Sequence, residues 1–417
     1  MKLPILLILL SLAGGLTLGL LPQLGFMGWV NEQQAKFYYD QGKVQYKEHR
    51  MLEARRSFSE ALKCQPYFPA ALLYRGCANH ELGDQIGAYN DYNFCICLDP
   101  ELAAAYHNRA ELRENFGDDV GAFRDYAQAV GLEPNDPRFL ASRGRMRLVL
   151  HDPVGAIADC NQALGMNPKA PFVLYIRGEA KRKVGDFAGA EADYTYAIQL
   201  APNNPEYSYV RGTLRYSVAN IRGALGDFDQ AIKLNPFSAE FYFSRANTYP
   251  KEASKNAIED YGYAIRLNPK YAEAIAERGN LRSRLKDFAG ADGDYEIAMK
   301  LEPSNANIRT DYGIHLYRQK RKLQAIAECD RAIRIQPNST YAYLFRGMFR
   351  QELNNLKGAM EDFDRAVEFG PQCRCPYYRR ALLKLRCGDK AGAKRDWMNT
   401  LRLDPHFEDN TGKLASL

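Results

Sequence analysis

The sequence predicts an all-α protein built as a solenoid from about eleven copies of one helix–turn–helix unit. Three observations support this fold class: prolines recur at a step of 34 residues, and two sets of small residues recur in the same phase. A fixed period of this length is typical of a repeat array in which one unit is copied and stacked. One step is 33 residues, from Pro236 to Pro269. The prolines are Pro66, Pro100, Pro134, Pro168, Pro202, Pro236, Pro269, Pro303, Pro337, Pro371 and Pro405.

Small residues keep three fixed positions in each unit. The position five residues before the proline holds alanine in nine units, and Cys95 and Thr400 in the other two. The position 24 residues before the proline holds glycine or alanine in ten units, for example Gly144 and Gly178. The position twelve residues before the proline is always alanine: Ala54, Ala88, Ala122, Ala156, Ala190, Ala224, Ala257, Ala291, Ala325, Ala359 and Ala393.

The unit that ends at Pro202 illustrates the expected elements. A first helix starts at Pro171, and Gly185 supplies a turn after it. Asp186 is placed to cap the second helix by accepting hydrogen bonds from its first amide groups. The closing proline disfavours helical geometry in the residue before it, so the second helix ends there.

The glycine in the first helix needs a physical reason, because glycine costs a helix about 1 kcal/mol relative to alanine. We expect Gly178 to let the first helix lie against Ala190 and Ala197 of the second helix. A single hairpin cannot bury its apolar face alone, so stability is expected to come from stacked neighbours.

This pattern resembles the tetratricopeptide repeat family over residues 35–407. The resemblance implies a right-handed α-solenoid, or superhelix, whose first helices line a concave groove. Residues 408–417 are then a C-terminal tail. The unit that ends at Pro269 departs from the pattern, since it is one residue short and carries Pro250 near its turn. Its first helix should therefore end early.

The N-terminal segment, residues 1–30, has a different composition. No charged residue occurs between residues 3 and 30, and residues 3–21 are mostly apolar. The length of this run lies between that of a signal peptide and that of a spanning helix. An uncleaved membrane anchor and a cleaved signal sequence therefore both stay open, and each implies that the array is exported. Trp29 would suit a membrane–water interface.

No catalytic or cofactor-binding motif is recognisable. The six histidines are scattered, and neither a glycine-rich phosphate loop nor a nucleophile elbow occurs. Nine cysteines show no spacing typical of zinc sites. The net charge of +6 is too small to indicate nucleic-acid binding. We therefore expect no enzyme activity, no cofactor, no metal, no nucleic acid and no small-molecule substrate.

The strongest polar pattern is a double ladder of arginines and aspartates. Pairing within each unit, such as Arg177 with Asp193 and Arg346 with Asp362, would brace the stack, whereas unpaired arginines would form a track for an anionic ligand. The first unit lacks both members, which favours pairing. The arginines are Arg75, Arg109, Arg143, Arg177, Arg211, Arg245, Arg278, Arg346 and Arg380. The aspartates are Asp91, Asp125, Asp159, Asp193, Asp227, Asp260, Asp294, Asp362 and Asp396.

The function that the sequence favours is a non-catalytic scaffold, exported or membrane-tethered through residues 3–21, which binds a protein or peptide segment in its groove. The alternative is a glycan- or polymer-binding module of the cell envelope, with groove tyrosines as stacking platforms. The resemblance to the family implies the groove residues Tyr39, Tyr46, His80, His107, Glu111, Arg145, Tyr175, Glu179, Arg182, Tyr209, Tyr216, Phe243, Asn247, Asn280, Arg284, Tyr317, Tyr341 and Tyr378.

Overall fold

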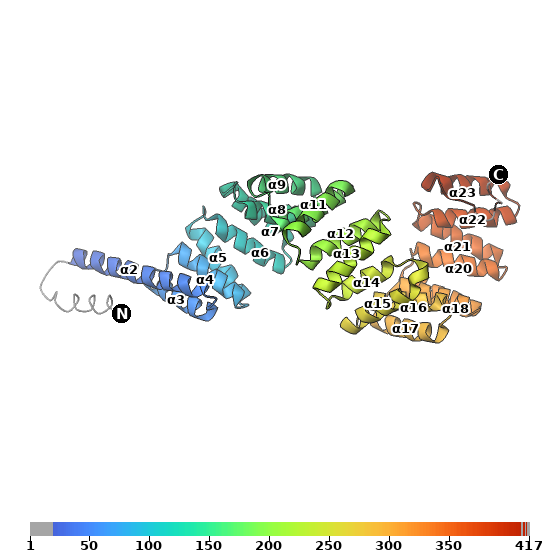
Figure 1. Cartoon of the computed structure of the whole chain (residues 1–417), viewed down its shortest axis with the longest axis horizontal. Coiled ribbons are helices and arrows are strands. Elements are labelled where there is room, and N and C mark those ends of the chain that lie inside the picture. The colour runs from blue at the N-terminus through green and yellow to red at the C-terminus, as the bar shows by residue number, and fades with distance from the viewer. Residues whose placement is uncertain (1–19, 410–411, 413, 415–417) are drawn as a thin grey trace. The chain divides into compact units, whose positions relative to one another are not determined.

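The computed structural model describes residues 20–409, 412 and 414. These residues form eleven pairs of α-helices and contain no strand, so the predicted all-α solenoid is confirmed. The chain divides into two compact units, Met1–Pro202 and Asn203–Leu417. Within each unit, the two helices of a pair contact each other and each pair contacts the next (Figure 1).

The first unit contains five helix pairs. They are α2 (Leu20–Lys47) with α3 (Met51–Cys64), α4 (Pro69–Glu81) with α5 (Gln85–Leu98), α6 (Ala103–Asn115) with α7 (Asp119–Leu132), α8 (Pro137–Val149) with α9 (Pro153–Met166), and α10 (Pro171–Lys183) with α11 (Phe187–Leu200).

The second unit contains six helix pairs. They are α12 (Pro205–Ser217) with α13 (Ile221–Leu234), α14 (Ala239–Thr248) with α15 (Ser254–Leu267), α16 (Ala272–Arg284) with α17 (Phe288–Leu301), α18 (Ala306–Arg318) with α19 (Lys322–Ile335), α20 (Thr340–Glu352) with α21 (Leu356–Phe369), and α22 (Arg374–Arg386) with α23 (Lys390–Leu403). A short 3-10 helix, Lys251–Ala253, lies between α14 and α15.

The turn and cap that the sequence predicts are confirmed. Gly185 adopts φ +84°, and the side chain of Asp186 accepts a hydrogen bond of 2.9 Å from the amide of Gly189. The early end of the first helix in the short unit is also confirmed. Helix α14 has ten residues, whereas the other first helices from α4 to α22 have thirteen, because Pro250 follows its end closely.

The reason for the small residue in the first helix differs from the expectation. A Cβ atom on Gly178 would lie 2.5 Å from Cε1 of Tyr194, so the ring of Tyr194, and not Ala190 or Ala197, requires the glycine. Both alanines are fully buried, as is Tyr194. In most repeats an aromatic ring of the second helix therefore packs under the first helix of its own pair, while Cys160 and Cys329 occupy this position in two repeats.

The structure tests the sequence predictions for the two ends of the chain to different extents. The predicted anchor or signal sequence, residues 3–21, lies almost entirely outside the described residues. Helix α2 runs from Leu20 across residue 30 without a break. None of the described helices has both the length and the apolar character required to cross a bilayer. At the other end Leu414 is buried against Trp397, so part of the tail covers the last pair.

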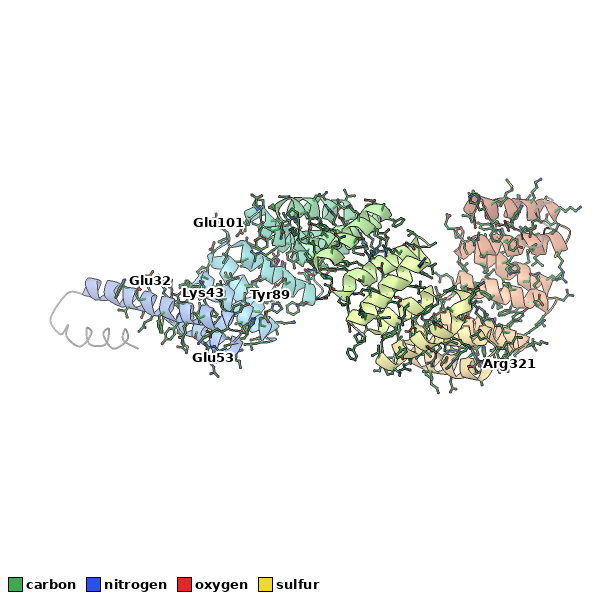
Figure 2. All side chains as sticks on the ribbon, viewed as in Figure 1. Glu32, Lys43, Glu53, Tyr89, Glu101 and Arg321 are labelled. Atoms are coloured by element: carbon green, nitrogen blue, oxygen red, sulfur yellow. The ribbon has the colours of Figure 1, made fainter. Side chains whose placement is uncertain are left out.

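Charged side chains that take no part in the packing between helices project away from the ribbon. Glu32, Glu101 and Arg321 are examples and are labelled in Figure 2. All three are exposed.

Candidate functional site

The arginine–aspartate ladder lies inside the helix pairs. Arg177 donates from Nε and Nη2 to the two carboxylate oxygens of Asp193, at 2.9 and 2.7 Å. Arg346 contacts Asp362 in the same way. The aspartates are at most 5% exposed, and charge-assisted pairs of this bidentate kind are among the strong polar contacts of proteins. All nine pairs of the ladder are present.

At least five of the nine ladder arginines also reach beyond their own helix pair. Arg177 donates from Nη1 to Asn161 of the preceding repeat at 2.8 Å, and Arg346 reaches Asp330 in the same way. The other three contacts join Arg109 to Asn93, Arg245 to Asp229 and Arg380 to Asp364. The arginines therefore connect successive repeats, and these guanidinium groups are occupied by the protein itself.

A second basic residue on the same aspartates was missed in the sequence. Lys181, one turn after Arg177, lies 2.8 Å from Asp193, and Arg350 lies 2.9 Å from Asp362. Seven aspartates have such a second partner, and in the unit of Asp91 the amide of Asn79 takes this place. The signal was available, because a basic residue recurs four residues after the arginine, which is one helical turn.

Where the ladder is interrupted, other polar groups fill the same space. In the first repeat, α2 with α3, the hydroxyl of Ser57 donates a hydrogen bond to Gln45 at 2.7 Å, and both residues are buried. In the unit that ends at Pro337, Glu328 receives Arg309 and Arg331. A buried acceptor is thus satisfied in every repeat.

All the predicted groove residues lie on the first helix of a pair, from α2 to α22. In the first compact unit, Met1–Pro202, the groove side chains mostly contact one another or side chains of adjacent first helices. Tyr39 and Tyr46 pack edge-on against Tyr74, with Lys43 5.3 Å from the ring of Tyr39. Phe172 stacks on Tyr175, and His80 is half-buried near the end of α4.

The charged groove residues of the first unit are paired. Arg145 donates to Glu114 of the preceding repeat at 2.7 Å, and Arg182 donates to Glu179 at 2.7 Å. His107 contacts Ser142 at 3.0 Å through Nε2. Its Nδ1 lies 4.0 Å from Glu111. This part of the surface therefore has little unpaired charge.

In the second unit, several predicted residues line one polar cleft. One part, of about 330 Å³, is lined by Tyr216, Asn247, Asn280 and Arg284 among others. The adjoining part, of about 510 Å³, is lined by Asn280 and Tyr341 among others. The two parts share Glu273, Glu277 and Asn280, and we call them together the α16 cleft.

The remaining predicted residues of the second unit lie outside the α16 cleft. Phe243 and Tyr378 are buried core residues that pack on Tyr271 and Phe407, so they present no groove surface. Tyr209 donates to Glu240 at 2.7 Å. Tyr317 stacks on the ring of Phe349.

Acidic residues of the α16 cleft were missed in the sequence. Glu273, Glu277, Glu302 and Asp311 line its larger part, and no basic residue does. The pKa of Asp311 is raised to about 6, mainly by burial and also by the charge of Glu277, while the hydrogen bond from Tyr341 and the charge of Arg318 act in the opposite direction. Burial also raises the pKa of Glu277. The missed signal is that Glu277 and Asp311 occupy the same position in consecutive repeats, 26 residues before the proline.

Comparison with known proteins agrees with this architecture. Residues 276–340 match a family model described as tetratricopeptide repeat. This stretch, from α16 to the start of α20, is therefore similar to tetratricopeptide repeats.

Three solved structures are similar to this chain at low sequence identity. The crystal structure of yeast Tom70 is 14% identical, with a TM-score of 0.50 over 92% of this chain and 94% of that chain. A tetratricopeptide repeat protein from Parabacteroides merdae is 19% identical, with a TM-score of 0.47 over 57% and 94%. The APC/C hetero-tetramer Cut9-Hcn1 is 12% identical, with a TM-score of 0.47 over 92% and 96%. No curated protein matches the chain.

Proposed function

We propose that the chain is a non-catalytic interaction scaffold that binds a segment of a partner protein along the first helices of its repeats. The observation that carries the proposal is the α16 cleft, which is lined by five of the groove residues predicted from the sequence. They lie on the first helices α12, α14, α16 and α20 and are Tyr216, Asn247, Asn280, Arg284 and Tyr341. Concave sites with a few convergent polar groups are the usual binding sites of proteins.

Photo-crosslinking tests this proposal. A photoreactive residue replaces Tyr216, which is 45% exposed and lines the cleft, in the full-length chain expressed in its own cells. The matched control carries the same residue at Tyr263, which is 46% exposed on the second helix α15. We expect adducts with a distinct partner protein at position 216 only. Equal adducts at both positions would contradict a groove-bound partner.

The proposal includes export or membrane tethering through residues 3–21, because that run is apolar and uncharged. A tethered chain should resist alkaline extraction from membranes and retain its N-terminal methionine. A secreted chain should be recovered in soluble form with a new N-terminus within the run. An alkali-extractable chain that retains its full N-terminus would contradict both versions.

A glycan-binding module has less support from the geometry. A stacking platform needs tyrosine faces along one open surface, but Tyr378 and Phe243 are buried. The hydroxyls of Tyr209 and Tyr341 are held by Glu240 and Asp311.

A further inference from the structure

The α16 cleft contains carboxylates that the protein does not neutralise. Among the described residues, none of Glu273, Glu277, Glu302 and Asp311 forms an ion pair. Their hydrogen-bond partners are neutral: Tyr341 donates to Asp311 at 2.7 Å, and Asn305 donates to Glu302 at 2.7 Å. Like charges gathered in a partly buried site repel one another and raise each other's pKa.

This arrangement is unusual for this chain. Each of the nine ladder aspartates is buried with at least one arginine on it, and seven have a second basic partner. Leaving a buried carboxylate without a cation is costly, because its lost hydration is not replaced. Asp311 and Glu277, which are half-buried, have no such cationic partner among the described residues.

Arg318 acts on Asp311 through its charge but forms no ion pair with it. Arg318 donates from Nη1 to the neutral groups of Asn280 and Ser283, at 3.2 and 3.1 Å. Burial lowers the pKa of this guanidinium, and the charge of Asp311 only partly offsets that effect. Arg284 lines the smaller part of the cleft but forms no ion pair with a described residue.

A second, independent observation points to a missing ligand. The side chain of Tyr295 is fully buried, and its hydroxyl has no hydrogen-bond partner. The charged groups that act on this hydroxyl are Asp311, Arg318 and Glu277, so it lies near the acidic end of the cleft. Among the described residues the equivalent hydroxyl of Tyr92 also has no partner, whereas that of Tyr126 donates to Glu114 at 2.5 Å. A buried hydroxyl without a partner is rare in folded proteins and calls for a missing group.

We propose that the α16 cleft binds a lysine or arginine side chain of the partner segment, with its positive group between Glu277 and Asp311. The ammonium or guanidinium group donates to the two carboxylates, and the hydroxyl of Tyr295 supplies a further acceptor. The cleft is large enough for the side chain and the adjoining backbone, at about 510 Å³. This inference rests on the proposed function and names the chemistry of the partner.

The charge of the whole chain does not favour such a ligand, so the preference must be local. The net charge is +6, which repels a basic peptide in general. A basic segment that binds must therefore owe its affinity to the acidic cleft.

The test uses the purified full-length chain and three short fluorescent peptides of glycine, serine and alanine, with evenly spaced lysine, glutamine or glutamate. Fluorescence anisotropy gives each dissociation constant. We expect the lysine peptide to bind at least about tenfold more tightly than the other two, a difference that must weaken with added salt. The double variant Glu277→Gln/Asp311→Asn should remove this preference. Glu361→Gln, an exposed carboxylate on α21 of the same unit, is the matched control and should retain it.

The variant is expected to fold, since amides replace carboxylates of the same shape and relieve repulsion. A thermal midpoint at or above that of the wild type checks this point. Equal binding of the three peptides, no binding of the lysine peptide, or an equal loss in the Glu361→Gln control would each overturn the inference. The crosslinking result at Tyr216 is independent of these peptides, so a partner that binds without a lysine or arginine preference leaves the scaffold function intact.

Discussion

Substitution of Gly178 by alanine tests why the first helix carries a small residue. The new Cβ would lie 2.5 Å from Cε1 and 2.8 Å from Cδ1 of Tyr194, closer than Cβ atoms approach other atoms. The ring cannot move away easily, because it is fully buried and its hydroxyl donates to Glu179. Overpacking of this kind costs about 1–3 kcal/mol, while alanine regains about 1 kcal/mol of helix propensity. We expect a net loss of up to about 2 kcal/mol.

Gly144 provides the matched control at the same position of another repeat. There the second helix carries Cys160 in place of an aromatic residue, and a Cβ on Gly144 would meet its nearest atoms at 3.4 Å, an ordinary contact. Gly144→Ala should therefore stabilise the array by about 0.5–1 kcal/mol through helix propensity alone.

Amide hydrogen exchange measures the two substitutions locally. Exchange in α10 and α11 reports on Gly178→Ala, and exchange in α8 and α9 reports on Gly144→Ala. Urea unfolding followed by circular dichroism gives the global effect, but repeat arrays can unfold in parts. If Gly178→Ala stabilises its repeat as Gly144→Ala does, the ring contact is not the reason for the glycine.

Three further outcomes are expected. Arg177→Ala should lower the unfolding free energy by about 2–3 kcal/mol, because Asp193 loses a two-point charged contact, and an unchanged urea midpoint would count against bracing. Lys320→Gly should stabilise by about 1 kcal/mol, since Lys320 holds φ +65°, and a lower thermal midpoint would refute the strain. The pKa of Asp311 is raised to about 6 in the folded chain. Protonation of its carboxyl group therefore stabilises the fold in full below about pH 4, and this stabilisation is lost as the pH rises through 6. Asp311→Asn should therefore reduce the fall in unfolding free energy between pH 5 and pH 7.5 by about 1–1.5 kcal/mol, and parallel pH profiles of variant and wild type would refute this.

Most of the fold could be predicted from the sequence because the repeat presents the same local signals many times. The proline ends each second helix, and the cap residue begins it, as Asp186 does with the amide of Gly189. The turn position was less predictable, since His151 and Lys286 also adopt positive φ where other repeats use glycine. Those conformations are set by the packing of the two helices, which a local signal does not reveal.

The contacts between side chains were only partly predictable. The pairing of Arg177 with Asp193 follows from their joint recurrence, but the role of Lys181 needed the three-dimensional arrangement around one carboxylate. The ring of Tyr194 under Gly178 was not expected, because sequence spacing does not say which residue of the second helix faces the glycine.

The acidic site shows how a repeat separates packing from binding. Positions that keep one residue type through the array, such as the ladder aspartates, are buried and paired, so they are committed to stability. Glu277 and Asp311 share one position, but other repeats place Tyr74 or Phe345 there, so the packing of the repeat does not require a charge. An unneutralised charge at such a position lowers stability, as the raised pKa of Asp311 indicates. A cation supplied by a partner would remove this cost, so binding of a basic side chain should lower that pKa and stabilise the second unit more at pH 7.5 than at pH 5.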